Sequence, residues 1–179
     1  MRAYLLSGLA SLAFATVAQA QSVDHTLPNG QRMVLPSAVA GCNTPVPLDG
    51  EATMGADLTC RVGATTGAPP TVLATVAVLG MKRPSTVTPR HFLILSTESW
   101  WPDDTPEQRG ARITTRTKTL ASGPARFLCV HRDDVPNLTG DALCALDAPT
   151  IQFMAAGHST MASTADDAVD TVLAAVTLL

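Results

Sequence analysis

The N-terminus of this chain decides where it folds and therefore which cross-links it can form. A charged residue, Arg2, precedes an almost unbroken apolar run at 4–17, and a small-x-small sequence follows at 18–20. This order is typical of a secretory signal peptide that is cleaved after Ala20. The alternative, a membrane anchor, needs about 18 to 20 apolar residues, and this run is shorter. We therefore expect residues 1–20 to be removed and the remainder to be exported to the periplasm or secreted.

The exported part, residues 21–179, has a length that suits one domain with a sizeable core. Its best candidate for a second membrane segment, Thr71 to Leu79, is too short to cross a bilayer and is typical of a buried strand. We predict a single domain with no membrane span once the signal peptide has been removed. The sequence makes no prediction of the oligomeric state.

The chain has four cysteines, and an even number in an exported protein favours two disulfides. Three pairings are possible from the sequence. We favour Cys42 with Cys60 and Cys129 with Cys144, because each pair lies within one region of the chain. The rival use is a zinc site, but the chain has neither a C-x-x-C motif nor paired cysteine and histidine spacing. We therefore expect no metal and no other cofactor.

Proline and glycine are concentrated in the first part of the exported chain. Residues 28–70 hold six of the thirteen prolines and six of the twelve glycines, a density that interrupts helices and long strands. Within this part, Arg32 to Leu35 and Thr59 to Val62 have the composition of short strands. We predict a loop-rich segment over 28–70 that is held together by the disulfide between Cys42 and Cys60.

Strand patterns dominate the remainder of the chain. Apolar or alternating runs occur at 71–79, His91 to Ser96, Ala111 to Leu120, 125–130 and 150–155. The turn residues at 121–124 join two of these runs as a hairpin. The connections are too short for repeated helical crossovers, which favours antiparallel pairing.

A helical pattern closes the sequence. Apolar residues recur at intervals of three and four from Ala165 to Val176, and Ser163 or Thr164 has the side chain of an N-cap. We expect this helix to continue to the C-terminus. The predicted fold class is α+β, with a mostly antiparallel sheet, a packed C-terminal helix and disulfide staples.

Charge is divided between two parts of the chain. Residues 82–132 hold nine lysines and arginines against four acidic residues, whereas 133–179 hold seven aspartates and no lysine or arginine. If 111–120 is a strand, Arg112, Arg116 and Lys118 share one face because side chains alternate. That face is either neutralised by the acidic C-terminal region or available to an anionic envelope partner. The chain has a net charge of −3 and no nucleic-acid-binding motif, which excludes nucleic acid as a partner.

Trp100 and Trp101 lie outside the predicted strands, in a segment rich in proline and aspartate. In an extended chain, which the proline after Trp101 favours, adjacent side chains point to opposite sides. We therefore expect one tryptophan to be at least partly exposed. Because tryptophan is enriched in interface hot spots, the pair is a candidate binding site. The alternative is that both rings pack over the edge of the core as a lid.

Short catalytic motifs are absent from the sequence, which has no G-x-S-x-G, no H-E-x-x-H and no phosphate-binding glycine loop. Two histidines nevertheless have neighbours that suit a catalytic base: aspartates follow His131 closely, and Ser159 follows His158. Alternation along a strand puts His131 on the same side as Phe127, which favours a structural, hydrogen-bonded role for it.

The sequence leaves two functions of different classes open. The first is a non-enzymatic exported domain that binds a protein or an anionic component of the envelope or the extracellular space. Its candidate contact residues are Trp100, Trp101, Arg112, Arg116 and Lys118. The alternative is a small secreted hydrolase without a recognisable short motif, in which His131 or His158 is the base.

Overall fold

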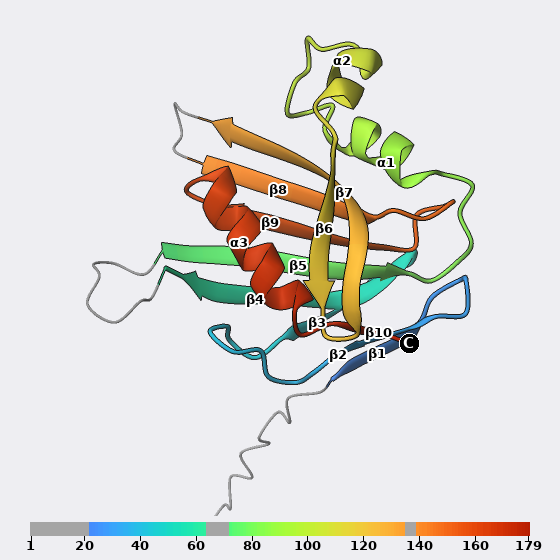
Figure 1. Ribbon diagram of the computed structural model, residues 1–179, viewed down its shortest axis with the longest axis vertical. Helices are drawn as coiled ribbons and strands as arrows, with labels where there is room; N and C mark the ends of the chain where they lie inside the picture. The colour runs from blue at the N-terminus through green and yellow to red at the C-terminus, as the bar shows by residue number, and fades with distance from the viewer. Residues whose placement is uncertain (1–21, 64–71, 135–138) are drawn as a thin grey trace, which may run out of the picture.

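The computed structural model describes residues 22–63, 72–134 and 139–179 (Figure 1). The predicted signal peptide lies outside these residues, as does Thr71. Within them, seven strands pair antiparallel in the order β3-β4-β5-β9-β8-β7-β6. Their bounds are β3 Val46–Asp49, β4 Thr53–Val62, β5 Val72–Met81, β6 Thr114–Leu120, β7 Gly123–Asp134, β8 Thr139–Leu146 and β9 Phe153–Ser159.

A smaller sheet and three helices complete the described fold. The small sheet has the order β1-β2-β10, with β1 Val23–Thr26, β2 Arg32–Leu35 and β10 Thr177–Leu178. The helices are α1 Pro89–Ser96, α2 Pro106–Ala111 and α3 Ala162–Leu173. The protein is therefore mostly antiparallel sheet with a helix near the C-terminus and two disulfides, roughly an α+β fold in which β structure dominates.

Helix α3 lies diagonally across one face of the large sheet (Figure 1). Its predicted apolar stripe is buried, at Ala165, Ala168, Val169, Val172 and Leu173. The stripe packs on a core cluster centred on Phe127 and Phe153, whose rings meet edge to face at 6.2 Å. The apolar period therefore identified both the helix and the face that it buries.

Both predicted ends of this helix are wrong. The N-cap is Met161, which makes no side-chain cap bond. Instead, Asp133 of β7 accepts a hydrogen bond of 2.6 Å from the backbone N–H of Ala162. This carboxylate satisfies one of the unpaired N–H groups at the start of the helix. The helix does not reach the C-terminus, because it ends at Leu173 and the chain then enters β10, which pairs with β2.

The segment predicted as a strand from His91 to Ser96 is helix α1. Pro89 occupies the first turn, where its missing N–H costs nothing. Thr88 is the N-cap, and its hydroxyl accepts a hydrogen bond from the backbone N–H of His91. The helix buries Leu93 against the opposite face of the sheet from α3. The Thr-Pro pair before the apolar run was the local signal for this start.

The strand predicted from Ala111 to Leu120 begins three residues later than expected. Ala111 ends helix α2, and Arg112 is its C-cap. Thr105 and Gln108 form a capping box at the other end of this short helix. Arg112 therefore does not belong to the strand that carries Arg116 and Lys118.

The segment predicted to be loop-rich holds more regular structure than expected. In its described part, 28–63, β2 agrees with the predicted Arg32 to Leu35, and the predicted Thr59 to Val62 is the end of the ten-residue strand β4. Strand β3 was not expected, since Pro47 lies inside it. Proline is tolerated there because β3 is the edge strand of the large sheet.

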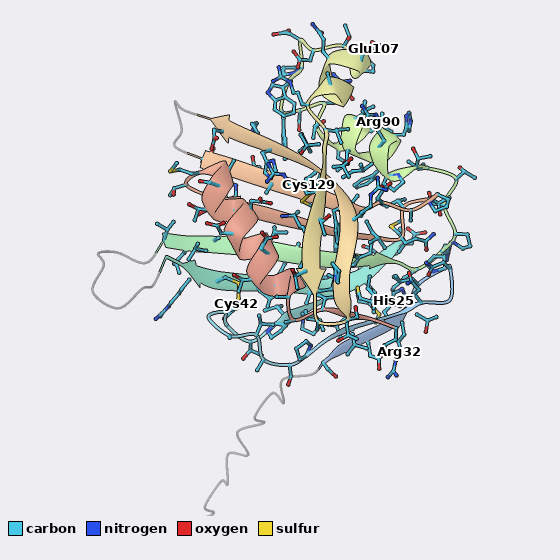
Figure 2. The ribbon with its side chains drawn as sticks, in the orientation of Figure 1. His25, Arg32, Cys42, Arg90, Glu107 and Cys129 are labelled. Carbon is cyan, nitrogen blue, oxygen red and sulfur yellow. A yellow bond between two sulfur atoms is a disulfide. The ribbon has the colours of Figure 1, made fainter. Side chains whose placement is uncertain are left out.

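Both favoured disulfides are present, Cys42 with Cys60 and Cys129 with Cys144. Each joins residues that face one another across an antiparallel pair. Figure 2 labels Cys42 and Cys129, which lie in separate parts of the fold. The second disulfide lies wholly inside the core beneath α3. In the part of the chain that the structure describes, no helix has both the length and the apolar character to cross a bilayer.

Candidate functional site

The two faces of the large sheet are covered to different extents. Helix α3 contacts β4 to β9 on one face, whereas α1 on the other face contacts mainly β7 and β8. A second core cluster, which includes Leu93, Val130 and Ile151, fills the space beneath α1. Met154 of β9 and Leu79 of β5 still pack in that cluster, whereas the part of this second face around Thr59, Thr75 and His158 lies outside it.

A groove of about 570 Å³ lies on this uncovered part of the sheet. We call it the sheet groove. Its apolar floor includes Ala77 of β5, Leu143 of β8 and Ala156 of β9, and Trp100 forms one wall. Its polar lining includes Asn43, Asp57, Thr59, Thr75, Asp141 and His158. A concave, mainly apolar surface with a few convergent polar groups is the usual form of a binding site.

Strand register places the polar side chains in one row across the sheet. Thr59 pairs with Thr75, Thr75 with His158, His158 with Asp141, and Asp141 with Arg132. Directly paired residues in an antiparallel sheet point to the same side, so the row stands on one face. The five residues come from five different strands, and the pairing of β5 with β9 joins two parts of the chain that are far apart in sequence.

Asp141 links His158 to Arg132 through its two separate oxygens. Its Oδ1 lies 2.7 Å from Nδ1 of His158. Its Oδ2 accepts from Arg132, at 3.1 Å from Nε and 2.8 Å from a terminal guanidinium nitrogen. Asp141 is largely buried, with 15% of its side chain exposed, whereas His158 is 56% exposed. The pair thus has a fixed inner carboxylate and an outer imidazole that faces the groove.

The bond to Asp141 assigns the tautomer of the neutral imidazole. A carboxylate only accepts hydrogen bonds, so Nδ1 of His158 carries the proton. Nε2 is then left with a lone pair, on an exposed ring that lines the groove. Such an arrangement can accept a hydrogen bond from a ligand or remove a proton from a nucleophile.

Trp100 is held by the turn that follows α1 rather than by an extended chain. Its backbone N–H and that of Trp101 both donate to the carbonyl of Thr97, at 3.0 and 3.3 Å. The prediction that adjacent rings point to opposite sides is therefore wrong. The two rings meet edge to face at 5.7 Å, and both are half-buried against the second core cluster.

The two tryptophans have different neighbours. The guanidinium of Arg132 lies 5.4 Å from the ring centre of Trp100, which joins this ring to the row of polar residues. The guanidinium of Arg112 lies 4.5 Å from the ring centre of Trp101 and also binds Asp104 at 2.8 Å. Only Trp100 lines the groove. The structure thus divides a pair that the sequence treated as one site.

The predicted basic face is divided as well. Arg112 belongs to the Trp101 corner, on the other side of the sheet from Lys118. Arg116 and Lys118 point toward α3, where Lys118 lies 2.6 Å from Asp166 and 2.7 Å from Asp170. Arg116 lies 3.5 Å from Asp166. The acidic C-terminal region therefore pairs with these cations, which is the neutralised alternative that the charge pattern left open.

Asp166 is the centre of this charge cluster. Burial alone would raise its pKa, but the close contacts with His131 and Lys118, together with their charges, hold the pKa of Asp166 well below its usual range. Nε2 of His131 is 3.1 Å from the carboxylate, although its N–H is not well aligned with it. His131 accordingly lies on the α3 face of the sheet with Phe127, the side that strand alternation predicted.

His158, the other candidate base, does not share a face of the sheet with Ser159, the residue that follows it in the sequence. Ser159 points to the α3 face, and its hydroxyl donates to the carbonyl of Leu73 at 2.9 Å. His158 and Ser159 therefore do not share a site. In the described ranges, no group of three or more histidine, cysteine or acidic side chains is placed to hold a metal ion.

Three residues of the row carried no sequence signal of their own. Asp141, Arg132 and Thr75 are ordinary residue types in apolar strands, and β8 itself was not predicted. Their importance follows from the pairing of β8 with β7 and β9. Comparison of the chain with protein families, with curated proteins and with solved structures finds no match in any of the three.

Proposed function

We propose that this protein is an exported binding domain, and that the sheet groove receives an apolar segment of a partner protein. The observation that carries the proposal is the uncovered apolar floor beside Trp100. A half-buried tryptophan next to such a floor has the features of an interface hot spot, since it offers a large contact area at low conformational cost.

Two exposed apolar side chains extend this surface beyond the groove floor. Val46 on β3 is 56% exposed and Leu73 on β5 is 59% exposed. Register places both on the groove face, since Val46 pairs with Asp57 and Leu73 lies two residues from Thr75. Apolar groups that converge on one face in this way support a protein segment as the occupant, rather than a small polar molecule.

The test is capture from a cell-envelope extract with protein that begins at Gln21, compared with two matched variants. Trp100→Ala removes the groove wall, whereas Trp101→Ala removes a neighbouring ring that does not line the groove. A third variant, Thr75→Trp, fills the groove from an exposed floor position. Circular dichroism establishes that each variant is folded before binding is measured.

The proposal expects one partner to be retained by the wild type and Trp101→Ala and lost with Trp100→Ala and Thr75→Trp. A loss of about tenfold to a hundredfold in affinity corresponds to one hot-spot residue. A partner that binds all four proteins equally would contradict the groove as the site.

A second candidate function is hydrolysis with His158 as the base, and the 2.7 Å bond to Asp141 favours it. Nε2 would take a proton from water, the hydroxide would attack an acyl carbon, and the leaving alkoxide would regain that proton. His158→Gln is then expected to lower the hydrolysis of a p-nitrophenyl ester by about a hundredfold. His131→Gln is the control, because His131 lies on the other face beneath α3. Equal rates in wild type and His158→Gln would exclude this function.

A further inference from the structure

We infer that the sheet groove selects a partner segment that carries a basic side chain among its apolar residues. The inference rests on the proposed function and specifies the chemistry of the partner. The preference for a basic side chain follows from a comparison of the polar groups of the lining that already have a partner with those that have none among the described residues.

The first acceptor is Nε2 of His158. Because Nδ1 donates to Asp141, Nε2 of the neutral ring keeps its lone pair, and this exposed ring lines the groove. A ligand that pairs with it must bring an N–H or O–H donor.

The second acceptor is the carboxylate of Asp57, which is exposed on β4 and lines the same groove. None of the ion pairs formed within 22–63, 72–134 and 139–179 includes Asp57. A carboxylate beside an apolar floor is complementary to an ammonium or guanidinium group.

Neither Arg132 nor Arg61, two cations of the sheet strands on this face, offers a free positive charge to the groove. Arg132 is committed to Asp141 and to the ring of Trp100. Arg61 lies four residues from Asp57 along β4, beyond Thr59, and does not line the groove. The lining therefore offers acceptors to a ligand at Asp57 and His158.

A lysine or arginine side chain meets both requirements of this surface. Its methylene stem can lie along the apolar floor formed by residues such as Ala77 and Ala156, while its charged end reaches a carboxylate. The net charge of the chain, −3, attracts a basic segment at longer range.

The test uses an array of short synthetic peptides with apolar residues at alternate positions and one central position that is lysine, arginine, glutamine or glutamate. The protein is tested as wild type, Asp57→Asn, Trp100→Ala and Asp167→Asn. Asp167→Asn is the matched control, because Asp167 is also an exposed carboxylate but lies on α3, on the other side of the sheet.

The expected result is binding at least tenfold tighter to lysine or arginine peptides than to their glutamate counterparts. Asp57→Asn is expected to reduce this preference by about fivefold or more, and Asp167→Asn to retain it. Peptides that bind in a Trp100-dependent way without preferring a basic residue would overturn this inference and leave the proposed function standing. If no peptide binds in a Trp100-dependent way, the proposed function falls, and this inference falls with it.

Discussion

Lys118 and Asp166 form an ion pair, with Nζ 2.6 Å from Oδ1, between strand β6 and helix α3. Only 3% of the Lys118 side chain is exposed, and Asp170 provides a second carboxylate at 2.7 Å. The cationic strand and the acidic helix, which the charge pattern of the sequence showed as separate features, thus belong to one internal contact.

Replacement of Asp166 is expected to destabilise the fold. Asp166→Asn leaves Lys118 buried with one carboxylate instead of two and should lower the free energy of unfolding by about 3 kcal/mol. Asp167→Asn changes an exposed neighbour and should alter stability by less than about 0.5 kcal/mol. Urea unfolding of both variants measures the difference. Equal midpoints would show that the ion pair contributes nothing to stability.

The same pair predicts a pH dependence of stability. The pKa of Asp166 is lowered by folding, so its contribution is complete above the ordinary value of 3.8 and is lost as the pH falls through the folded-state pKa. The stability difference between wild type and Asp166→Asn should therefore be fully present at about pH 5 and shrink below about pH 4. A difference that instead grows on acidification would reverse the assigned sign.

The two disulfides are expected to differ in their effect on stability. Their sequence separations, 18 and 15 residues, are similar. Each disulfide should therefore stabilise the fold by about 3 kcal/mol, because it restricts the unfolded chain. The pair Cys129 and Cys144 is also fully buried, whereas Cys42 is half-buried. The double variant Cys129→Ala with Cys144→Ala should therefore cost more than Cys42→Ala with Cys60→Ala. Denaturant unfolding under non-reducing conditions would contradict this if it gave the opposite order.

Gly140 on β8 allows the start of α3 to approach the sheet closely. A Cβ at this position would lie 2.0 Å from the backbone nitrogen of Ala162. Gly140→Ala should force this helix end away and cost about 3 kcal/mol or more. Gly110→Ala is the control, because the nearest atom there is a flexible side chain at 3.4 Å and alanine favours the helix. Thermal unfolding that ranks the two variants equally would argue against this close approach.

Features with a local or periodic cause could be predicted from the sequence. The apolar period fixed the buried face of α3 from Ala165 to Leu173, because a helix repeats its face regardless of what covers it. The pairing of Cys42 with Cys60 followed from proximity along the chain. Helix α1 was missed because a six-residue run such as His91 to Ser96 suits either a strand or a helix, and the Thr88 cap with Pro89 after it was the local discriminator.

The candidate site depends on contacts that no local pattern specifies. Asp141 and His158 are 17 residues apart and meet only because β8 and β9 pair in a particular register. A shift of one residue would send Asp141 to the other face of the sheet. Trp100 was singled out by composition alone, and its separation from Trp101 depends on the turn after α1.

The most direct test of the groove uses tryptophan as its own reporter. The chain has two tryptophans, so Trp101→Phe leaves Trp100 as the single fluorophore, and Trp100→Phe leaves Trp101. We predict that the captured partner shifts the Trp100 emission to shorter wavelength and protects it from acrylamide, while Trp101 emission changes little. Binding that leaves the emission and quenching of Trp100 unchanged would contradict the sheet groove as the binding site.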